Sequence, residues 1–235
     1  MQLIVIGLNH KTAPVAVREG FSFTEERVKY ALGRLREYDE LREGVILSTC
    51  NRTEMYAVAA TAEARPVMRD FLLTVTGYPG NPDAYLFSLT NEDCIDHLFR
   101  VSASLDSQVV GEGQILSQVK KAYAMARDTG ATGTVLNTLF NRAIAVGKRV
   151  RTETRIACNA VSISYAAVEQ AKKVCGDLTG AKILLLGAGK MSELTARHLL
   201  SNGVQTVFVA NRRYERAVQL AAKFHGVAVP LEQFR

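Results

Sequence analysis

Ala181-Lys182-Ile183-Leu184-Leu185-Leu186-Gly187-Ala188-Gly189-Lys190-Met191-Ser192 decides the fold of the second half of the chain. Its apolar run predicts a strand at 181–186, and the glycines that follow predict a tight turn into a helix at 191–200. Behind this unit we expect a strand at 206–210, a helix at 214–224 and a strand at 227–229. The β-α-β-α-β order predicts half of a doubly wound parallel sheet.

The glycine turn of this unit is also a candidate phosphate site. Gly187 permits the tight turn, Gly189 lets the backbone approach a pyrophosphate, and the helix N-terminus supplies N–H groups. Ser192 stands where a third glycine is usual. The alternative is that the glycines only shape a strand-to-helix turn. The candidate cofactor-binding residues of this turn are Gly187, Ala188, Gly189, Lys190, Met191 and Ser192.

The end of the next expected strand indicates which dinucleotide would bind. About 24 residues after Gly187, where an NAD enzyme carries an acidic residue, the chain has Asn211-Arg212-Arg213. An arginine pairs with a 2′-phosphate, whereas an aspartate repels it. The sequence therefore favours NADP over NAD.

The first half of the chain has a different order of elements. Apolar runs predict strands at 3–8, 45–47 and 55–59, and Ser22 with Glu25 forms a capping-box pattern for a helix that begins near Ser22. A further helix is expected at 62–75. The β-α-β-β-α order predicts an α+β domain with an antiparallel sheet.

Residues 91–174 are expected to form at least four helical segments. The third is a long linking helix, with an apolar face that includes Leu136, Phe140 and Gly147. Its other side is basic, and this side either follows a phosphate backbone or is the solvated face of the helix. The residues on that side are Asn141, Lys148, Arg151 and Arg155.

Length and composition limit the class of protein. The 235 residues allow one large domain or two modest ones, and 48% hydrophobic residues indicate a packed core. No membrane span or secretion signal is visible, and the four cysteines form no C-x-x-C pair or zinc-ligand spacing. We therefore expect a cytoplasmic protein without a metal site. The net charge of +6 is compatible with an anionic partner.

Cys50 is the candidate nucleophile. It follows a predicted buried strand, and the guanidinium of Arg52 favours a thiolate nearby. The other cysteines lie among helical apolar positions and are expected to be buried and structural. A thiol together with an NADP site suggests that an acyl group is taken onto sulfur and reduced by hydride to an aldehyde. The three cysteines expected to be structural are Cys94, Cys158 and Cys175.

Several stretches, in order along the whole chain, closely resemble glutamyl-tRNA reductases. Gly113 stands where that family usually has Pro, and Ser192 where it usually has Gly. The stretches are Gly7-Leu8-Asn9-His10-Lys11-Thr12-Ala13-Pro14, Ser48-Thr49-Cys50-Asn51-Arg52-Thr53-Glu54, His97-Leu98-Phe99-Arg100, Leu105-Asp106-Ser107, Gly111-Glu112-Gly113-Gln114-Ile115-Leu116, Gly147-Lys148-Arg149-Val150-Arg151-Thr152-Glu153-Thr154 and Val209-Ala210-Asn211-Arg212.

The resemblance implies that NADPH reduces glutamyl-tRNA(Glu) to glutamate-1-semialdehyde, the first step of tetrapyrrole synthesis by the five-carbon route. It places the nucleophile at Cys50 and the important histidine at His97, with His10 as an equal candidate on the residues alone. It also implies that Arg52 grips the substrate carboxylate and that Glu112 pairs with its ammonium. The implied substrate contacts are Thr49, Asn51, Arg52, Ser107, Glu112, Gly113, Gln114 and Gln118.

The expected organisation is a catalytic α+β domain at 1–156 and a partial Rossmann-type NADPH domain at 157–235. Since the second half of the cofactor domain and the family's dimerisation helices are missing from the expected pattern, we expect thioester and esterase chemistry only, in a mainly monomeric chain. The resemblance implies a homodimer for full-length members, with hand-over to glutamate-1-semialdehyde aminotransferase. The alternatives are a tRNA-docking module whose thiol is inert and a shikimate-dehydrogenase-like oxidoreductase.

Overall fold

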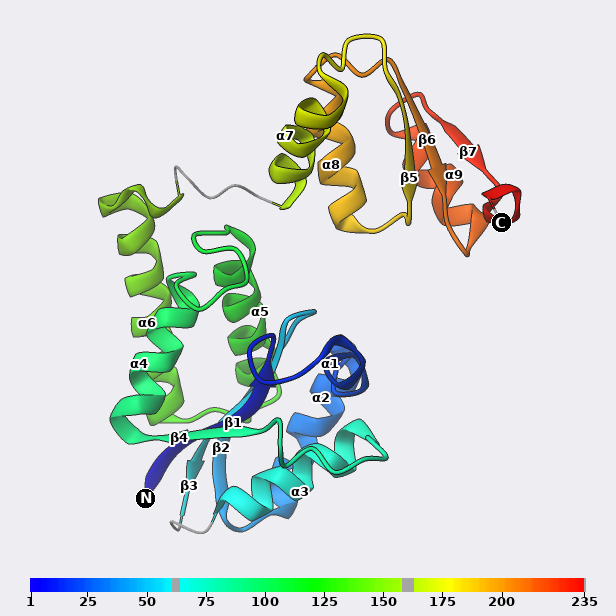
Figure 1. Cartoon of the computed structure of the whole chain (residues 1–235). Helices are drawn as coiled ribbons and strands as arrows, with labels where there is room; N and C mark the ends of the chain where they lie inside the picture. Colours follow the sequence, from blue (N-terminus) through cyan, green and yellow to red (C-terminus); the bar gives the residue numbers. More distant parts are fainter. Residues whose placement is uncertain (61–63, 158–162, 235) are drawn as a thin grey trace. The chain divides into compact units, whose positions relative to one another are not determined.

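The computed structural model describes residues 1–60, 64–157 and 163–234. The chain divides into two compact units, Met1–Ala160 and Val161–Arg235. Each unit has its own sheet and its own buried core (Figure 1). The units are therefore described one at a time.

The first unit contains a four-stranded antiparallel sheet with the strand order β2-β3-β1-β4. The central strands β1 and β3 are almost wholly buried, which suits the apolar sequence of β1, whereas β3 also buries Arg52, Thr53 and Glu54. The strands are β1 (Gln2–Asn9), β2 (Leu41–Ser48), β3 (Arg52–Ala59) and β4 (Phe87–Thr90).

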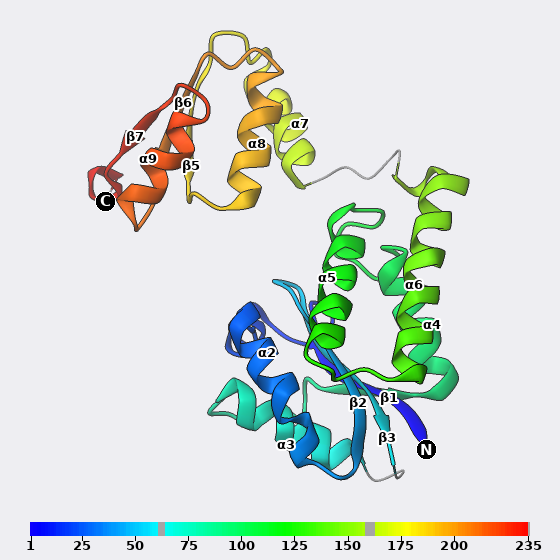
Figure 2. The same ribbon diagram turned by 180° about the vertical axis from the view of Figure 1, so that it is seen from behind.

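Helices cover both faces of this sheet. Figures 1 and 2 show α2 and α3 on one face and α4, α5 and α6 on the other. The core lies in the two layers between the helices and the sheet. The helices are α1 (Val15–Gly20), α2 (Glu25–Gly33), η1 (Arg34–Glu37), α3 (Ala64–Thr76), α4 (Asn91–Ser102), α5 (Gln114–Asp128), α6 (Thr134–Glu153) and η2 (Arg155–Ala157).

The predicted α+β class with an antiparallel sheet is confirmed, with local differences. The capping box at Ser22 is wrong, because Thr24 is the N-cap of α2 and accepts from the Arg27 N–H at 3.3 Å. Strand β4 and helix α1 were not predicted, since four half-buried residues and a six-residue helix carry little periodicity.

Helix α6 is held near both of its own ends by contacts within the first unit. At its N-terminus the buried Glu43 carboxylate of β2 accepts from the N–H groups of Val135 (3.2 Å) and Leu136 (2.8 Å). Near its C-terminus Gly147 lets the helix approach α4, because a Cβ there would lie 2.5 Å from the Ser102 carbonyl oxygen. The face of α6 that carries Gly147 therefore packs against the end of α4.

The second unit contains the predicted parallel sheet, in the order β5-β6-β7. Side chains of β6, α8 and α9 form its main core, and α7 packs against α8 through Val168 and Leu199. The elements are α7 (Ile163–Cys175), β5 (Lys182–Leu186), α8 (Lys190–Leu200), β6 (Thr206–Ala210), α9 (Tyr214–Ala222), β7 (Val227–Val229) and η3 (Leu231–Phe234).

Of the three other cysteines, all expected to be buried, the structure describes two. Cys94 is buried as expected, whereas the expectation is wrong for Cys175, the last residue of α7, because residues 173–177 around that helix end are all exposed. Cys158 lies outside the described residues. Across the part of the chain that the structure describes, no helix is long and apolar enough to cross a membrane, and no cluster of His, Cys, Asp and Glu side chains could hold a metal ion.

Candidate functional site

The turn between β2 and β3 presents Cys50 to solvent on a braced backbone. The Thr49 hydroxyl accepts from the N–H groups of Asn51 and Arg52, both at 3.1 Å. The Arg18 side chain donates to the Cys50 carbonyl oxygen at 3.0 Å and to the Asn51 amide oxygen at 2.8 Å. The turn is thus braced by its own Thr49 hydroxyl and by the Arg18 side chain from α1, while Cys50 stays exposed to solvent.

Strand β3 places three polar side chains under α4, α5 and α6. Arg52, Glu54 and Tyr56 alternate along the strand, so they share one face of the sheet. All three are at most 2% exposed. Buried charges need partners of opposite charge, and Arg52 and Glu54 supply one for each other.

Both terminal nitrogens of the Arg52 guanidinium are engaged in this network. Its Nη1 donates to Glu54 Oε1 at 2.7 Å, and both Nη atoms lie 3.3 Å from Asp106 Oδ2. Nη2 also donates to the Asp106 main-chain oxygen. The contact with Glu54 is the shorter one, while the Asp106 carboxylate is held more loosely by Arg52.

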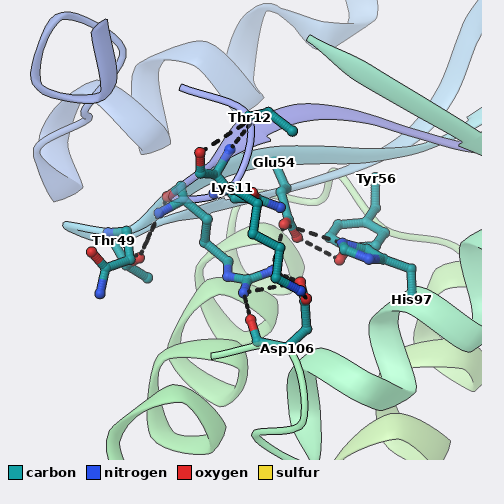
Figure 3. A network of polar contacts seen from close by, with 10 residues as sticks. Lys11, Thr12, Thr49, Glu54, Tyr56, His97 and Asp106 are labelled. Carbon is teal, nitrogen blue, oxygen red and sulfur yellow. Dashed lines mark hydrogen bonds and ion pairs between the residues drawn. The ribbon is translucent and has the colours of Figure 1, made fainter. Parts of the chain in front are cut away.

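Glu54 is the buried anion that joins the network to His97. Burial by itself would raise the pKa of this carboxyl, but the Arg52 charge and hydrogen bonds from His97 and Tyr56 outweigh it and lower the pKa to about 2. His97 Nε2 lies 3.1 Å from Oε1, and the Tyr56 hydroxyl donates to Oε2 at 2.7 Å. A histidine held by a buried carboxylate is oriented as in known acid–base pairs (Figure 3).

The 103–113 loop between α4 and α5 brings Asp106 onto this row. The other oxygen of its carboxylate, Oδ1, pairs with Lys11, which follows the end of β1. Burial opposes ionisation of Asp106, but the bonds from Lys11 and Arg52 lower its pKa. Asp106 is therefore ionised at neutral pH and bridges two cations (Figure 3).

The loop is closed at its two ends. The Gly111 N–H donates to the Ser104 carbonyl oxygen at 3.0 Å, and the Ser104 hydroxyl donates to the Glu112 carbonyl oxygen at 2.6 Å. From α6, Arg151 Nη1 donates to the carbonyl oxygens of Gly111 (3.3 Å) and Glu112 (3.1 Å). Arg151 was predicted on the basic side of the long helix, and in the structure it holds the loop that carries Asp106.

We expect Arg151→Ala to loosen this loop and raise the KM for substrate about tenfold, with a smaller change in kcat, because two hydrogen bonds from a charged group are lost. Steady-state kinetics measures the split. Arg149→Ala is the matched control, since Arg149 is exposed and pairs with Glu153 in solvent. Equal effects of the two variants would contradict a loop-holding role.

The remaining predicted substrate residues are spread over the same end of the first unit. Ser107 and Glu112 are half-buried in the loop, Gly113 is exposed, and Gln114 begins α5. Burial raises the pKa of the Glu112 carboxyl despite the nearby Arg52. Gln118 lines a different pocket, between α2, β2 and α5. That pocket is lined by Phe23, Glu25, Val28, Ile46, Ser48, Gln118, Lys121, Ala122 and Met125.

The alternative histidine, His10, is also close to the turn. Its main-chain N–H donates to the Asn51 carbonyl oxygen at 2.9 Å. Burial and the Arg52 charge lower its pKa, so the imidazole is neutral at pH 7. Its Nδ1 is buried, and within the described residues this atom has no hydrogen-bond partner. Both histidines therefore belong to the neighbourhood of Arg52.

Four residues of this network, Lys11, Glu54, Tyr56 and Asp106, were given no role from the sequence, although all but Tyr56 lie in the stretches that carry the family resemblance. A usable signal for two of them was present, since Glu54 and Tyr56 follow Arg52 at the period of a strand. Lys11 and Asp106 meet only because the fold brings the end of β1 to the 103–113 loop. No local pattern gives that contact.

The glycine turn of the second unit lies between β5 and α8, as predicted. Gly187 has a φ of +108°, which favours glycine, and a Cβ at Gly189 would meet no atom within 4 Å. Gly187 to Gly189 therefore leave open space before the helix N-terminus, which Lys190, Met191 and Ser192 begin. A separate pocket at the end of β6 is lined by Asn211, Arg212, Arg213 and Arg216.

Comparison with protein families matches each unit to a different description. Residues 6–154 match "Glutamyl-tRNAGlu reductase, N-terminal domain". Residues 169–235 match "Shikimate / quinate 5-dehydrogenase". The first match contains the whole Cys50 and Arg52 neighbourhood, and the second contains the glycine turn.

Similar proteins cover the chain nearly from end to end. A glutamyl-tRNA reductase from Pelotomaculum thermopropionicum is 53% identical over 99% of this chain and 53% of its own length. Glutamyl-tRNA reductase 2 from Koribacter versatilis is 51% identical, with the same coverage. The solved glutamyl-tRNA reductase from Methanopyrus kandleri is 38% identical, with a TM-score of 0.65 over 99% of this chain and 55% of the other. The chain spans about half the length of these relatives.

Proposed function

Since the chain belongs to the glutamyl-tRNA reductase family through the domain at residues 6–154, we propose that it takes the glutamyl group of glutamyl-tRNA(Glu) onto Cys50 as a thioester. With NADPH held by the second unit, this thioester would receive a hydride and release the Cys50 thiol, giving glutamate-1-semialdehyde, the first step of the five-carbon route. We assign the acyl-transfer chemistry to residues 1–156 and the start of the NADPH-binding domain to residues 157–235. The proposed setting is the cytoplasm, with a homodimer and an aminotransferase partner for full-length members.

The exposed Cys50 carries this proposal. It stands on a turn fixed by Thr49 and Arg18, two residues before a buried arginine that suits a carboxylate. Cys94 is unsuited to the task, because burial and the neighbouring Glu54 raise its pKa to about 12. A nucleophilic thiol needs access to solvent-borne substrate, and Cys50 has it.

In the proposed step the Cys50 sulfur attacks the ester carbonyl carbon. A C–S bond forms, the bond from carbon to the ribose oxygen breaks, and the tRNA leaves with a proton on that oxygen. His97, held by Glu54, is the proposed proton donor, and His10 is the alternative. The N–H groups of Asn51 and Arg52 already donate to Thr49, so stabilising the oxyanion there would require them to exchange partners.

The second unit fits the proposed cofactor. The open space at Gly187 and Gly189 suits a pyrophosphate at the N-terminus of α8, and the arginine-lined pocket after β6 suits a 2′-phosphate. NADPH bound there would supply the hydride. The residues proposed to hold it are Gly187, Ala188, Gly189, Lys190, Met191, Ser192, Asn211, Arg212 and Arg213.

We expect the double variant Arg212→Gln, Arg213→Gln to lose most of its preference for NADP(H) over NAD(H), a change of about 1.5 to 3 kcal/mol in relative binding free energy. Dissociation constants for NADPH and NADH, measured by fluorescence, give the ratio. Arg197→Gln serves as the control, because Arg197 is exposed and pairs with Glu193 on α8. An unchanged ratio would mean that other residues recognise the 2′-phosphate.

Trapping tests the proposed function as a whole. The protein is mixed with glutamyl-tRNA(Glu) without NADPH, quenched in acid and mapped by mass spectrometry, and we expect one glutamyl group on Cys50. A tRNA-docking module would bind glutamyl-tRNA without being acylated. An oxidoreductase of free small molecules would neither bind glutamyl-tRNA nor be acylated by it. Acylation at another residue, or none in a protein that binds the tRNA, refutes the thioester route.

A further inference from the structure

Asp106 shares its carboxylate between two cations in a way that leaves one contact weak. Oδ1 pairs with Lys11, whereas Oδ2 lies 3.3 Å from both Nη atoms of Arg52. Arg52 keeps a shorter bond of 2.7 Å to Glu54 on its other side. The Asp106 carboxylate is therefore the partner of Arg52 that exchanges most easily for another carboxylate.

The four charges of the network sum to zero. Arg52 and Lys11 are cations, Glu54 and Asp106 are anions, and the Arg52, Glu54 and Asp106 side chains are at most 9% exposed. A ligand that brings only a carboxylate would leave this buried group with a net negative charge, which is costly. A ligand that brings a carboxylate and an ammonium keeps the sum at zero.

Geometry gives Asp106 freedom to change partners. The Lys11 side chain, which pairs with Asp106 Oδ1, is 57% exposed. Lys11 can therefore follow the carboxylate or release it to water. Glu54, by contrast, is fixed on the central strand β3 and bonded to Tyr56 and His97.

We propose that Asp106 determines the specificity of this site for ligands that carry both a carboxylate and an ammonium. The ligand's carboxylate takes the place of the Asp106 carboxylate on Arg52, and the released Asp106 accepts the ligand's ammonium. This inference rests on the proposed function, because it assumes that the glutamyl side chain binds at Arg52. It assigns the ammonium to Asp106, whereas the family resemblance points to Glu112.

Two small probes that differ only in the ammonium test this assignment. Glutamate α-methyl ester carries the carboxylate, the ester and the ammonium, and monomethyl glutarate lacks only the ammonium. Isothermal titration calorimetry of the 235-residue protein gives a dissociation constant for each, and the ratio of the two constants is the readout. Trapping of the glutamyl group on Cys50 from glutamyl-tRNA is measured in parallel. A failure of the proposed function then shows in the trapping experiment, and a failure of the Asp106 assignment shows in the ratio of dissociation constants.

In Asp106→Asn we expect the preference for the ammonium-bearing probe to fall about tenfold, mostly because monomethyl glutarate binds more tightly to a site that now has a net positive charge. In Lys11→Met we expect the preference to rise, because Asp106 loses its competing cation. Opposite signs from two neighbouring substitutions cannot come from a general loss of structure. Glu112→Gln is expected to change the ratio less than twofold, and so is the exposed control Asp128→Asn.

An unchanged ratio in Asp106→Asn overturns the proposal, as does an equal loss of both probes. A tenfold fall in Glu112→Gln with no fall in Asp106→Asn assigns the ammonium to Glu112 and also overturns it.

Discussion

The Cys50→Ser variant is expected to lose cleavage of glutamyl-tRNA by at least about 10³-fold, the order of loss seen when a covalent nucleophile is removed. A serine hydroxyl at neutral pH is a far weaker nucleophile than a thiolate unless a base activates it. No side chain is bonded to the Cys50 thiol among the described residues, and Arg18 contacts only the carbonyl oxygen of that residue. Release of free glutamate and deacylated tRNA measures the loss.

The binding of tRNA should change little in this variant, because one sulfur atom on an exposed turn is replaced by oxygen. Cys175→Ser is the matched control, since its thiol is also exposed but lies at the end of α7 in the second unit. Substantial cleavage by Cys50→Ser, together with normal cleavage by Cys175→Ser, would exclude Cys50 as the nucleophile.

The Arg52→Lys variant should lose about 2 to 5 kcal/mol of transition-state stabilisation for the glutamyl substrate. The two Nη atoms of Arg52 reach Glu54 and Asp106 at once, and one ammonium cannot keep both contacts. The substrate carboxylate would also lose a two-pronged donor. The ratio of kcat/KM for wild type and variant measures this loss, and discrimination against glutaminyl-tRNA should fall with it.

The same substitution should also lower the free energy of unfolding. The lysine side chain is shorter than arginine and leaves the buried carboxylates of Glu54 and Asp106 poorly paired, which costs on the order of 3 to 5 kcal/mol. Thermal unfolding of the variant gives this quantity and separates it from the kinetic loss. Arg149→Lys on the exposed side of α6 is the control. Near-normal turnover with unchanged discrimination would mean that another residue grips the carboxylate.

The periodic elements of this chain could be predicted from sequence. The strand at 206–210 was predicted with the bounds of β6, and the parallel sheet followed from the glycine turn and the apolar runs. Antiparallel pairing in the first unit followed from the order of elements. Failures occurred where local signals are weak, as in β4, or where two caps compete, as with Ser22 and Thr24.

Predicting the candidate site was harder for a different reason. Cys50 and Arg52 are two residues apart in sequence, so a motif could single them out. The partner of Arg52 at Asp106 lies 54 residues away, and Arg151 lies about 40 residues beyond the loop it holds. Contacts of that separation depend on how α4, α5 and α6 stack on the sheet, which no local pattern encodes.

Helix α6 is anchored near both of its ends. One anchor is the carboxylate of Glu43, which belongs to the edge strand β2. The other is the close approach of Gly147 to α4. Because Arg151 on the last turns of α6 also bonds to the carbonyl oxygens of Gly111 and Glu112, the span from Ser104 to Gly111 is attached to this anchored helix. The Asp106 carboxylate can then exchange partners through a local rearrangement of a short span whose two ends are joined by hydrogen bonds.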